Sequence, residues 1–249
     1  MPHIPTYVIH PTTGHEDREA HLVEHLPSVG LTDYEFIKEG DADALSNDII
    51  NDFFGPGLTL GGMSCNYKHY LSYKYMLERD QDYCLILEND VFVDKDILSQ
   101  IGRMLAEVKS KRNWLINIEE ASELVPIWYR KPGKLVYRAG KNKMAAGYIV
   151  DKYFAQTMVT YLEANLIDKN FDSLISQVAE ELAISLYWSH PPLVRQGSKD
   201  GTFASEISDE QQGFWVKIKS NTRNFYKMHV LSNIQPKRLR LFRPYKDDD

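Results

Sequence analysis

The sequence is poor in cysteine, in excess positive charge and in long hydrophobic segments. Its 249 residues include 2 cysteines, Cys65 and Cys84. Neither a disulfide framework nor a zinc site built from cysteines is therefore indicated, and a reducing compartment is expected. The net charge of -6 argues against a general nucleic-acid binder, because contacts with phosphates require a basic surface.

No apolar run approaches the length of a transmembrane helix, and the first residues lack the basic and then apolar layout of a signal peptide. We therefore expect a soluble, cytoplasmic protein. Neither an internal repeat nor a low-complexity linker is visible. These features predict a single domain over residues 1–249, with a basic C-terminal tail from about residue 236.

The most informative stretch lies at residues 82–96. Its apolar run, residues 83–87, is typical of a strand buried on both faces of a mostly parallel sheet. The run ends at Glu88, Asn89 and Asp90, and open α/β sheets bind ligands at the carboxyl ends of their strands. Alternation along the strand directs Glu88 and Asp90 to one side and Asn89 to the other. Because two converging carboxylates repel, we expect a divalent cation that carries substrate phosphates; an acidic loop without a ligand is the alternative.

Helices and strands alternate along the rest of the sequence, which favours a Rossmann-like α/β fold with a mostly parallel sheet flanked by helices. The predicted strands are residues 7–10, 34–37, 114–118 and 184–188, with a β-hairpin over 127–139 that turns at 131–133. The predicted helices are residues 16–26, 44–54, 62–79, 97–109 and 171–182, and the small, apolar segment 145–150 leads into a further helix that ends near residue 162. We expect His69, in one of these helices, to be packed or hydrogen-bonded rather than a ligand.

Residues 21–25 read H-x-x-E-H, a motif of one class of zinc peptidases. His21 and His25 would share a helix face, but no further acidic ligand can be identified. A solvated helix face is therefore the preferred interpretation. The glycine-rich segment 55–62 matches neither the dinucleotide fingerprint nor the Walker pattern.

Taken in order, these segments resemble glycosyltransferase family 25, which is linked to lipopolysaccharide biosynthesis. Members typically show Asp-Arg after the first strand, a Gly-Glu-x-Gly-Cys-x-x-Ser-His helix start, a strand ending Leu-Glu-Asp-Asp-Val and a Pro-Pro-Leu-Val-x-Gln element. The matching positions are residues 16–18, 61–69, 87–91, 146–150, 172, 191–196, 205 and 207. The sequence departs from the family pattern at four positions, where Gly62 replaces the glutamate, Ser64 the second glycine, Lys68 the serine and Asn89 the middle aspartate.

The resemblance implies a GT-A fold and a hexosyltransferase that uses a nucleotide-diphosphate sugar, with a UDP-sugar as the expected donor. It implies a glycan or lipid-linked oligosaccharide as the acceptor. Glu88 and Asp90 would hold Mn²⁺ or Mg²⁺. Hard oxygen ligands of this kind favour these ions over zinc. His190 is a candidate third ligand, because it follows a predicted strand near the expected cleft.

The same resemblance implies that Arg18, Asn89 and Gln196 join Glu88 and Asp90 in the nucleotide-sugar site. For Arg18, a surface ion pair is the alternative.

Asp172, at the start of a predicted helix, would position the acceptor or remove the proton of its hydroxyl group. Helix capping is the ordinary alternative for an aspartate at that place. For His190, the alternative to a metal ligand is a loop histidine before a proline pair.

Two other functions stay open at this stage: a catalytically silent sugar-nucleotide or carbohydrate-binding module, and the zinc peptidase suggested by residues 21–25. The basic tail offers a contact with an anionic membrane surface, and a solvated terminus is the alternative. Its basic residues are Lys237, Arg238, Arg240, Arg243 and Lys246.

Overall fold

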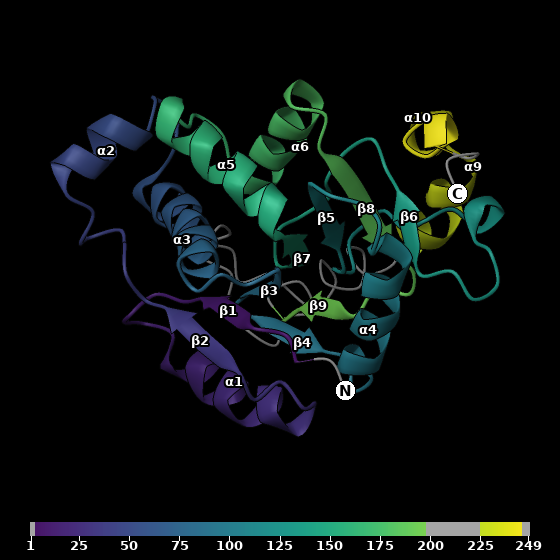
Figure 1. Ribbon diagram of the computed structural model, residues 1–249, viewed down its shortest axis with the longest axis horizontal. Coiled ribbons are helices and arrows are strands. Elements are labelled where there is room, and N and C mark those ends of the chain that lie inside the picture. The colour runs from purple at the N-terminus through teal and green to yellow at the C-terminus, as the bar shows by residue number, and fades with distance from the viewer. Residues whose placement is uncertain (1–2, 198–224, 246–249) are drawn as a thin grey trace, which may run out of the picture.

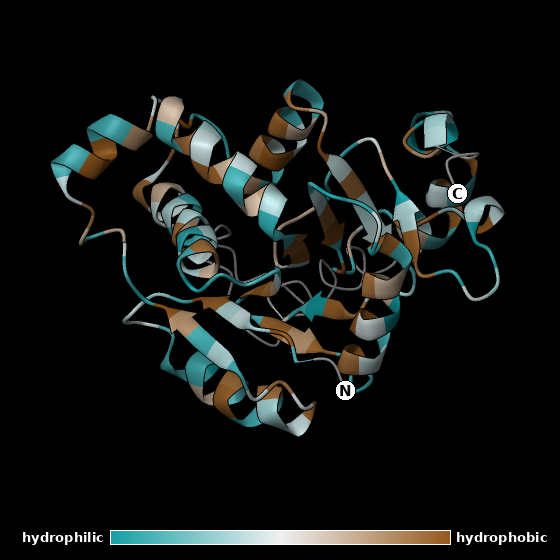
Figure 2. Ribbon diagram, viewed as in Figure 1, coloured by the Kyte–Doolittle hydropathy of each residue, from teal (hydrophilic) through white to brown (hydrophobic). Residues whose placement is uncertain are grey.

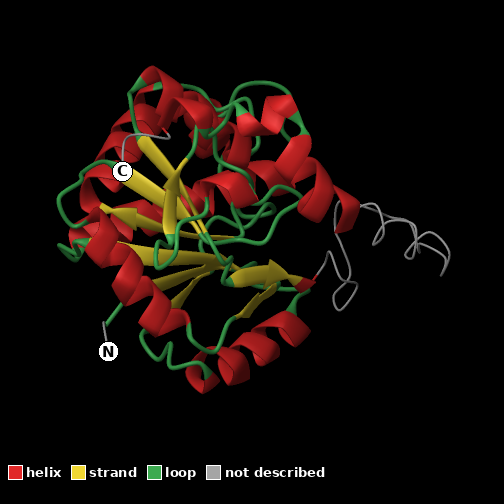
Figure 3. Cartoon of the chain, turned by 90° about the vertical axis from the view of Figure 1, so that its right-hand side faces the viewer, coloured by secondary structure: helices red, strands yellow, loops and turns green. Residues whose placement is uncertain are grey.

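A seven-stranded sheet with helices on both faces forms the centre of the molecule, in a computed structural model that describes residues 3–197 and 225–245 (Figures 1 and 3). The strand order is β2-β1-β3-β7-β5-β8-β6. Strands β7 and β6 run antiparallel to their neighbours and the other five share one direction, so the sheet is mostly parallel, as predicted. The strands of this sheet are β1 (Thr6–Ile9), β2 (Tyr34–Ile37), β3 (Tyr83–Glu88), β5 (Trp114–Asn117), β6 (Val136–Arg138), β7 (Gly147–Asp151) and β8 (Ser185–Ser189).

The helices divide between the two faces of the sheet. The buried side chains of α3, α5 and α6 pack on one face, and those of α1 and α4 pack on the other. The helices of the chain up to residue 197 are α1 (Glu16–Ser28), α2 (Asn47–Phe53), α3 (Leu60–Glu78), α4 (Ile97–Val108), the short 3₁₀ helix η1 (Ile127–Tyr129), α5 (Lys152–Ala164) and α6 (Phe171–Glu181).

Side-chain periodicity explains how these elements enclose two cores. In β3, Cys84 and Ile86 belong to the core under α3, α5 and α6, whereas Leu85 and Leu87 belong to the core under α1 and α4. The central strands are therefore hydrophobic on both faces, as Figure 2 shows by their colour.

A second, two-stranded sheet lies beside the end of β3. Strand β4 (Val91–Val93) pairs antiparallel with β9 (Val194–Gln196). This sheet packs closely on β7, because a Cβ atom at Gly147 would lie 2.9 Å from the Cβ atom of Val194. Glycine is the residue that permits this approach, which brings Gln196 to the end of β3.

The predicted elements agree with the structure over most of the described chain, but the β-hairpin over residues 127–139 is wrong. Its turn is present, whereas its first half is the 3₁₀ helix η1 and its second half, β6, pairs with the distant strand β8. The prediction of a single domain over residues 1–249 stays a prediction, and Ser205 and Ile207 of the family pattern lie outside the described residues.

The C-terminal segment packs against the body of the molecule near η1 and β8. Phe242 is buried against Trp188, with ring centroids 5.1 Å apart, and Arg238 donates hydrogen bonds to the carbonyl oxygens of Ser122 and Lys227. Phe242 and Arg238 therefore anchor residues 236–245 to the body. The basic side chains of this segment that are exposed to solvent are those of Lys237, Arg240 and Arg243. The elements of this segment are η2 (Lys227–Leu231), α9 (Ser232–Ile234), α10 (Pro236–Leu239) and η3 (Arg243–Tyr245).

None of the helices in the described ranges has both the length and the apolar character that spanning a membrane requires.

Candidate active site

Glu88 is the last residue of β3, and two elements distant in the sequence meet its carboxylate. Gln196, from β9, donates a hydrogen bond from Nε2 to Glu88 Oε2 over 3.1 Å. On the other side, His69 Nε2 of α3 lies 4.0 Å from Glu88 Oε1. Glu88 therefore lies between the small sheet and α3, and the predicted partner Gln196 is in direct contact with it.

Asn89 contacts a different set of residues. Arg18, which is buried in the first turn of α1, donates a hydrogen bond to Asn89 Oδ1 over 3.0 Å. The Asn89 amide nitrogen lies 3.2 Å from His10 Nδ1, and His10 Nε2 lies 3.1 Å from a carboxylate oxygen of Glu19. Burial lowers the pKa of His10, although the Glu19 carboxylate opposes this effect. Arg18 is thus fixed at the end of β3, where its guanidinium group lies beside the acidic residues.

Asp90 is 5% exposed, and its Oδ1 atom is buried with no hydrogen-bond partner among the described residues. Its backbone oxygen accepts a hydrogen bond from Gly197 N, so the loop is held from the β9 side. A buried carboxylate oxygen without a partner is unfavourable unless a cation or a hydrogen-bond donor reaches it. The buried Oδ1 atom of Asp90 therefore suits a cation, and the divalent-metal site of Asp90 and Glu88 stays a prediction.

Lys68 accounts for one departure from the family pattern in structural terms. It is buried in α3, and its Nζ atom donates hydrogen bonds to the backbone oxygens of His10, Ile37 and Lys38 and to Asp41 Oδ1. Burial lowers the pKa of Lys68, and the hydrogen bond to Asp41 opposes that shift. Lys68 thus fastens α3 to the carboxyl ends of β1 and β2, a role that a serine is too short to fill.

His69, the next residue, is held in one orientation. Its ring is parallel to that of Phe171, with centroids 4.0 Å apart, and its Nδ1 atom lies 2.8 Å from the hydroxyl oxygen of Tyr148. Burial lowers the pKa of His69 to about 3, so the imidazole is neutral at physiological pH. The expectation of a packed, hydrogen-bonded histidine is confirmed for Nδ1, whereas Nε2 has no hydrogen-bond partner in the described chain.

Asp172 follows Phe171 directly at the start of α6. Its Oδ1 atom accepts a hydrogen bond from Ser173 N, and no side chain of the N-cap residue Asn170 closes the helix. The stack of Phe171 on His69 connects this helix start to the end of β3. Asp172 is therefore carried by an element that packs on His69, the neighbour of Glu88, and its catalytic role stays a prediction.

His190 lies in a different environment, just after β8. Burial, together with the positive charges of Arg130 and Lys143, lowers its pKa to about 4. Within the described ranges, the group of potential metal ligands at the end of β3 consists of Cys65, His69 and Glu88, and His190 is not part of it. No hydrogen bond or ion pair in the described part of the chain connects His190 to the acidic residues, and its role as a ligand stays a prediction.

The two histidines of the H-x-x-E-H motif contact the small sheet. His25 Nε2 accepts a hydrogen bond from Val93 N over 2.8 Å, and His21 Nε2 lies 3.2 Å from the backbone oxygen of Val91. The two rings stack on each other beside Phe92. The preferred interpretation of a solvated helix face is wrong, because this face packs on β4, and the packing gives no support to a zinc peptidase.

The structure thus brings Arg18, Glu88, Asn89, Asp90 and Gln196 together at the carboxyl end of β3. Sequence reasoning did not identify Cys65 and His69 as neighbours of Glu88. The sequence did show that the two residues are four positions apart on one predicted helix. It gave no signal that this helix approaches the end of β3.

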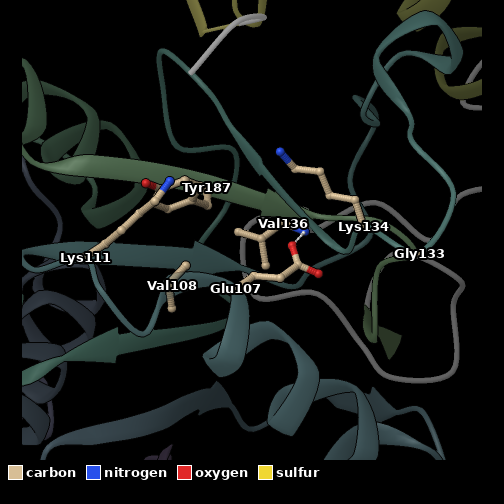
Figure 4. A pocket seen from close by; sticks show the side chains of 7 residues that line it. All are labelled: Glu107, Val108, Lys111, Gly133, Lys134, Val136 and Tyr187. Atoms are coloured by element: carbon tan, nitrogen blue, oxygen red, sulfur yellow. Dashed lines mark hydrogen bonds between the residues drawn. The ribbon is translucent and has the colours of Figure 1, made fainter. Parts of the chain in front are cut away.

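A separate pocket of about 530 Å³ lies between α4, β6 and β8 (Figure 4). It is lined by Glu107, Val108, Lys111, Gly133, Lys134, Val136 and Tyr187. Glu107 accepts hydrogen bonds from the backbone nitrogens of Leu135 and Val136. None of the candidate residues lines this pocket, so it does not form part of the site.

A mostly parallel α/β sheet with carboxylates and an arginine at a strand end is typical of enzymes that bind phosphorylated ligands at that edge. The family model described as glycosyltransferase family 25 (LPS biosynthesis protein) matches residues 15–175, which is more than half of the chain. The chain belongs to this family and is a glycosyltransferase.

No curated protein matches the chain. Among solved structures, the fold is similar to the structure of the inositol-1-phosphate CTP transferase from T. maritima, with a TM-score of 0.37 and 10% sequence identity. That similarity covers 88% of this chain and 97% of the other, and at this level it carries no conclusion about function.

Proposed function

We propose that the enzyme transfers a hexose from a nucleotide-diphosphate sugar, in the first place a UDP-sugar, to a glycan or lipid-linked oligosaccharide acceptor. In this proposal the chain has the GT-A architecture and depends on Mn²⁺ or Mg²⁺. The observation that carries it is Asp90 Oδ1, a buried carboxylate oxygen without a described partner at the end of β3.

Asp90 would hold the cation directly, and Glu88 would hold it directly or through water. When bound, the cation neutralises the charge that develops on the leaving diphosphate. Arg18 would contact a phosphate or the nucleotide, because its guanidinium group is held by Asn89 beside the same strand end. Gln196 would keep the Glu88 carboxylate in place through the hydrogen bond described above.

Asp172 would accept the proton of the acceptor hydroxyl group or position that group. Support comes from its place at the start of α6, directly after the residue that stacks on His69. The side chain is partly exposed, so an acceptor could reach it from solvent.

The experiment is a calorimetric titration of UDP-sugars with and without Mn²⁺, on the parent chain and on Asp90→Ala. The variant should lose metal-dependent donor binding and keep its stability, because the carboxylates of Glu88 and Asp90 repel each other when no metal is bound. Asp96→Ala, at an exposed aspartate six residues further on, is the matched control and should bind the donor normally.

Undiminished metal-dependent binding by Asp90→Ala would remove Asp90 from the site. Release of nucleoside diphosphate from the same panel of donors separates an active enzyme from a chain that binds the donor without turnover.

We further propose a peripheral contact with an anionic membrane through the C-terminal segment. Trp128 and Ile127 are 74% and 54% exposed, and both are hydrogen-bonded to Asn233, next to Ile234, which is 59% exposed. Exposed apolar side chains that adjoin exposed basic ones fit an interfacial membrane surface, where lipid-linked acceptors lie. The exposed basic residues are Lys237, Arg240 and Arg243.

A further inference from the structure

Three side chains of different chemistry meet where α3 approaches the end of β3. Cys65 Sγ, a ring nitrogen of His69 and a carboxylate oxygen of Glu88 all lie within 4.8 Å of one another. Cys65 and His69 are four residues apart on α3, so their side chains lie on the same face of the helix. Within residues 3–197 and 225–245, these three side chains form a group of potential metal ligands that lie close together.

The Nε2 atom of His69 is the observation that points to a ligand. His69 is 0% exposed, and Nε2 has no hydrogen-bond partner among the described residues. The ring cannot turn to satisfy it elsewhere, because Phe171 is stacked on the ring and Nδ1 is bonded to Tyr148. A buried polar nitrogen without a partner is unfavourable, and this one lies 4.0 Å from Glu88 Oε1.

We propose that Cys65, His69 and Glu88 bind a zinc ion at the end of β3. A thiolate and an imidazole favour Zn²⁺ over the hard cations Mn²⁺ and Mg²⁺. Three protein ligands leave a fourth position for water. This site goes beyond the proposed donor site, although the two share Glu88, and a carboxylate has enough lone pairs to serve both.

The geometry requires only a small adjustment. In a tetrahedral zinc site the ligand atoms are about 3.3–3.7 Å apart, given the usual Zn–N, Zn–O and Zn–S bond lengths. Cys65 and Glu88 are partly exposed, and closure of the site around zinc would draw their ligand atoms from within 4.8 Å toward the fixed ring of His69. Tyr148 is placed to make the outer hydrogen bond that metal-binding histidines usually make, with its hydroxyl oxygen 2.8 Å from Nδ1. In the zinc-bound form Nδ1–H would donate to that oxygen, and the lone pair of Nε2 would be left for the metal.

The first test is metal binding by the purified chain without any nucleotide. We expect one zinc ion per chain by elemental analysis after dialysis, and an apo form that binds Co²⁺ with a thiolate-to-cobalt charge-transfer band. A chain that takes up neither metal, or that binds Co²⁺ without a thiolate band, overturns the proposal.

Variants then assign the ligands. Cys65→Ser should lose the thiolate band and bind zinc at least about 100-fold more weakly, since even the loss of an outer hydrogen bond typically costs 10–100-fold. Tyr148→Phe should keep the band and weaken zinc about 10-fold or more. Cys84→Ala is the matched control, because Cys84 is the second cysteine and is buried beside Met76, and it should behave like the parent. An unchanged thiolate band in Cys65→Ser overturns the proposal.

X-ray absorption at the zinc edge of the parent chain keeps the test independent of how well the variants fold. One sulfur ligand is expected, and a shell of nitrogen and oxygen alone overturns the proposal. Asp90→Ala separates this site from the proposed donor site, since it should keep zinc and lose Mn²⁺-dependent donor binding. Loss of zinc by Cys65→Ser therefore tests the zinc site alone.

Discussion

Replacing Lys68 by methionine tests whether α3 is fastened to the carboxyl ends of β1 and β2 by a single ammonium group. The side chain of Lys68 is 3% exposed and that of Asp41 is 13% exposed, with 2.7 Å between Nζ and Oδ1. Methionine fills nearly the same volume, so the substitution removes the charge and the hydrogen bonds while it preserves most of the packing.

The expected loss is about 3 kcal/mol of unfolding free energy. Removal of one partner from a buried ion pair typically costs about 3–5 kcal/mol, and partial exposure of Asp41 places this case at the low end. Of the three backbone oxygens, those of Ile37 and Lys38 keep other donors, His10 N and Thr12 Oγ1, which limits the additional cost. For a chain of this size, the loss corresponds to a fall in Tm of about 6–12 °C.

Urea unfolding followed by circular dichroism measures this difference directly, provided that the slope with denaturant stays constant. Lys74→Met is the matched control on the same helix, because Lys74 forms an exposed ion pair with Glu163 at 3.5 Å and should change stability by at most about 0.5 kcal/mol. The double variant of Lys68→Met with Asp41→Asn should be less destabilised than the sum of the single variants, because the two groups interact directly. A stability of Lys68→Met within about 1 kcal/mol of the parent would refute the reasoning.

Three further outcomes are expected. Burial lowers the pKa of His25 in the folded chain. Below a pH of about 6.5, the ordinary pKa of histidine, the unfolded chain therefore binds more protons than the folded chain, and the stability falls as the pH decreases. His25→Gln keeps a hydrogen-bond acceptor without this proton and should flatten the decrease in urea-unfolding free energy between about pH 7 and about pH 5; an equally steep decrease contradicts this. Asp172→Asn should reduce sugar transfer by about 10²–10⁴-fold with near-normal donor binding in calorimetry, whereas Asp168→Asn, at an exposed position, should retain transfer; full activity of the former returns Asp172 to a capping role. Trp128→Ser should weaken sedimentation with phosphatidylserine vesicles, and Tyr153→Ser, at another exposed aromatic residue, should not; equal binding by both variants speaks against the membrane surface.

Much of the acidic strand end could be predicted from the sequence, because the relevant signals are local. An apolar run that stops at Glu88 specifies both a buried strand and polar groups at its end, and alternation separates the contacts of Glu88 from those of Asn89. The order of the elements then specifies a mostly parallel sheet.

What could not be predicted depends on contacts between distant segments. Strands β4 and β9 have three residues each, too few for a periodic pattern, and they form because residues 91–93 and 194–196 meet in space. The first half of the expected hairpin is a 3₁₀ helix that is held by Asn233, a residue more than a hundred positions away. The position of His69 next to Glu88 likewise follows from the packing of α3 on the sheet, not from either local sequence.

Gly147 has no side chain, and this allows the small sheet to lie close to β7. The same close approach sets how near Gln196 of β9 lies to Glu88. Any larger residue there would push Val194 outward, and Gln196, two residues further along β9, would move away from Glu88. The orientation of the Glu88 carboxylate therefore depends in part on the absence of a side chain at Gly147, on the neighbouring strand β7. Substitution of Gly147 is therefore a way to weaken the hydrogen bond between Gln196 and Glu88 without changing any polar group of the site.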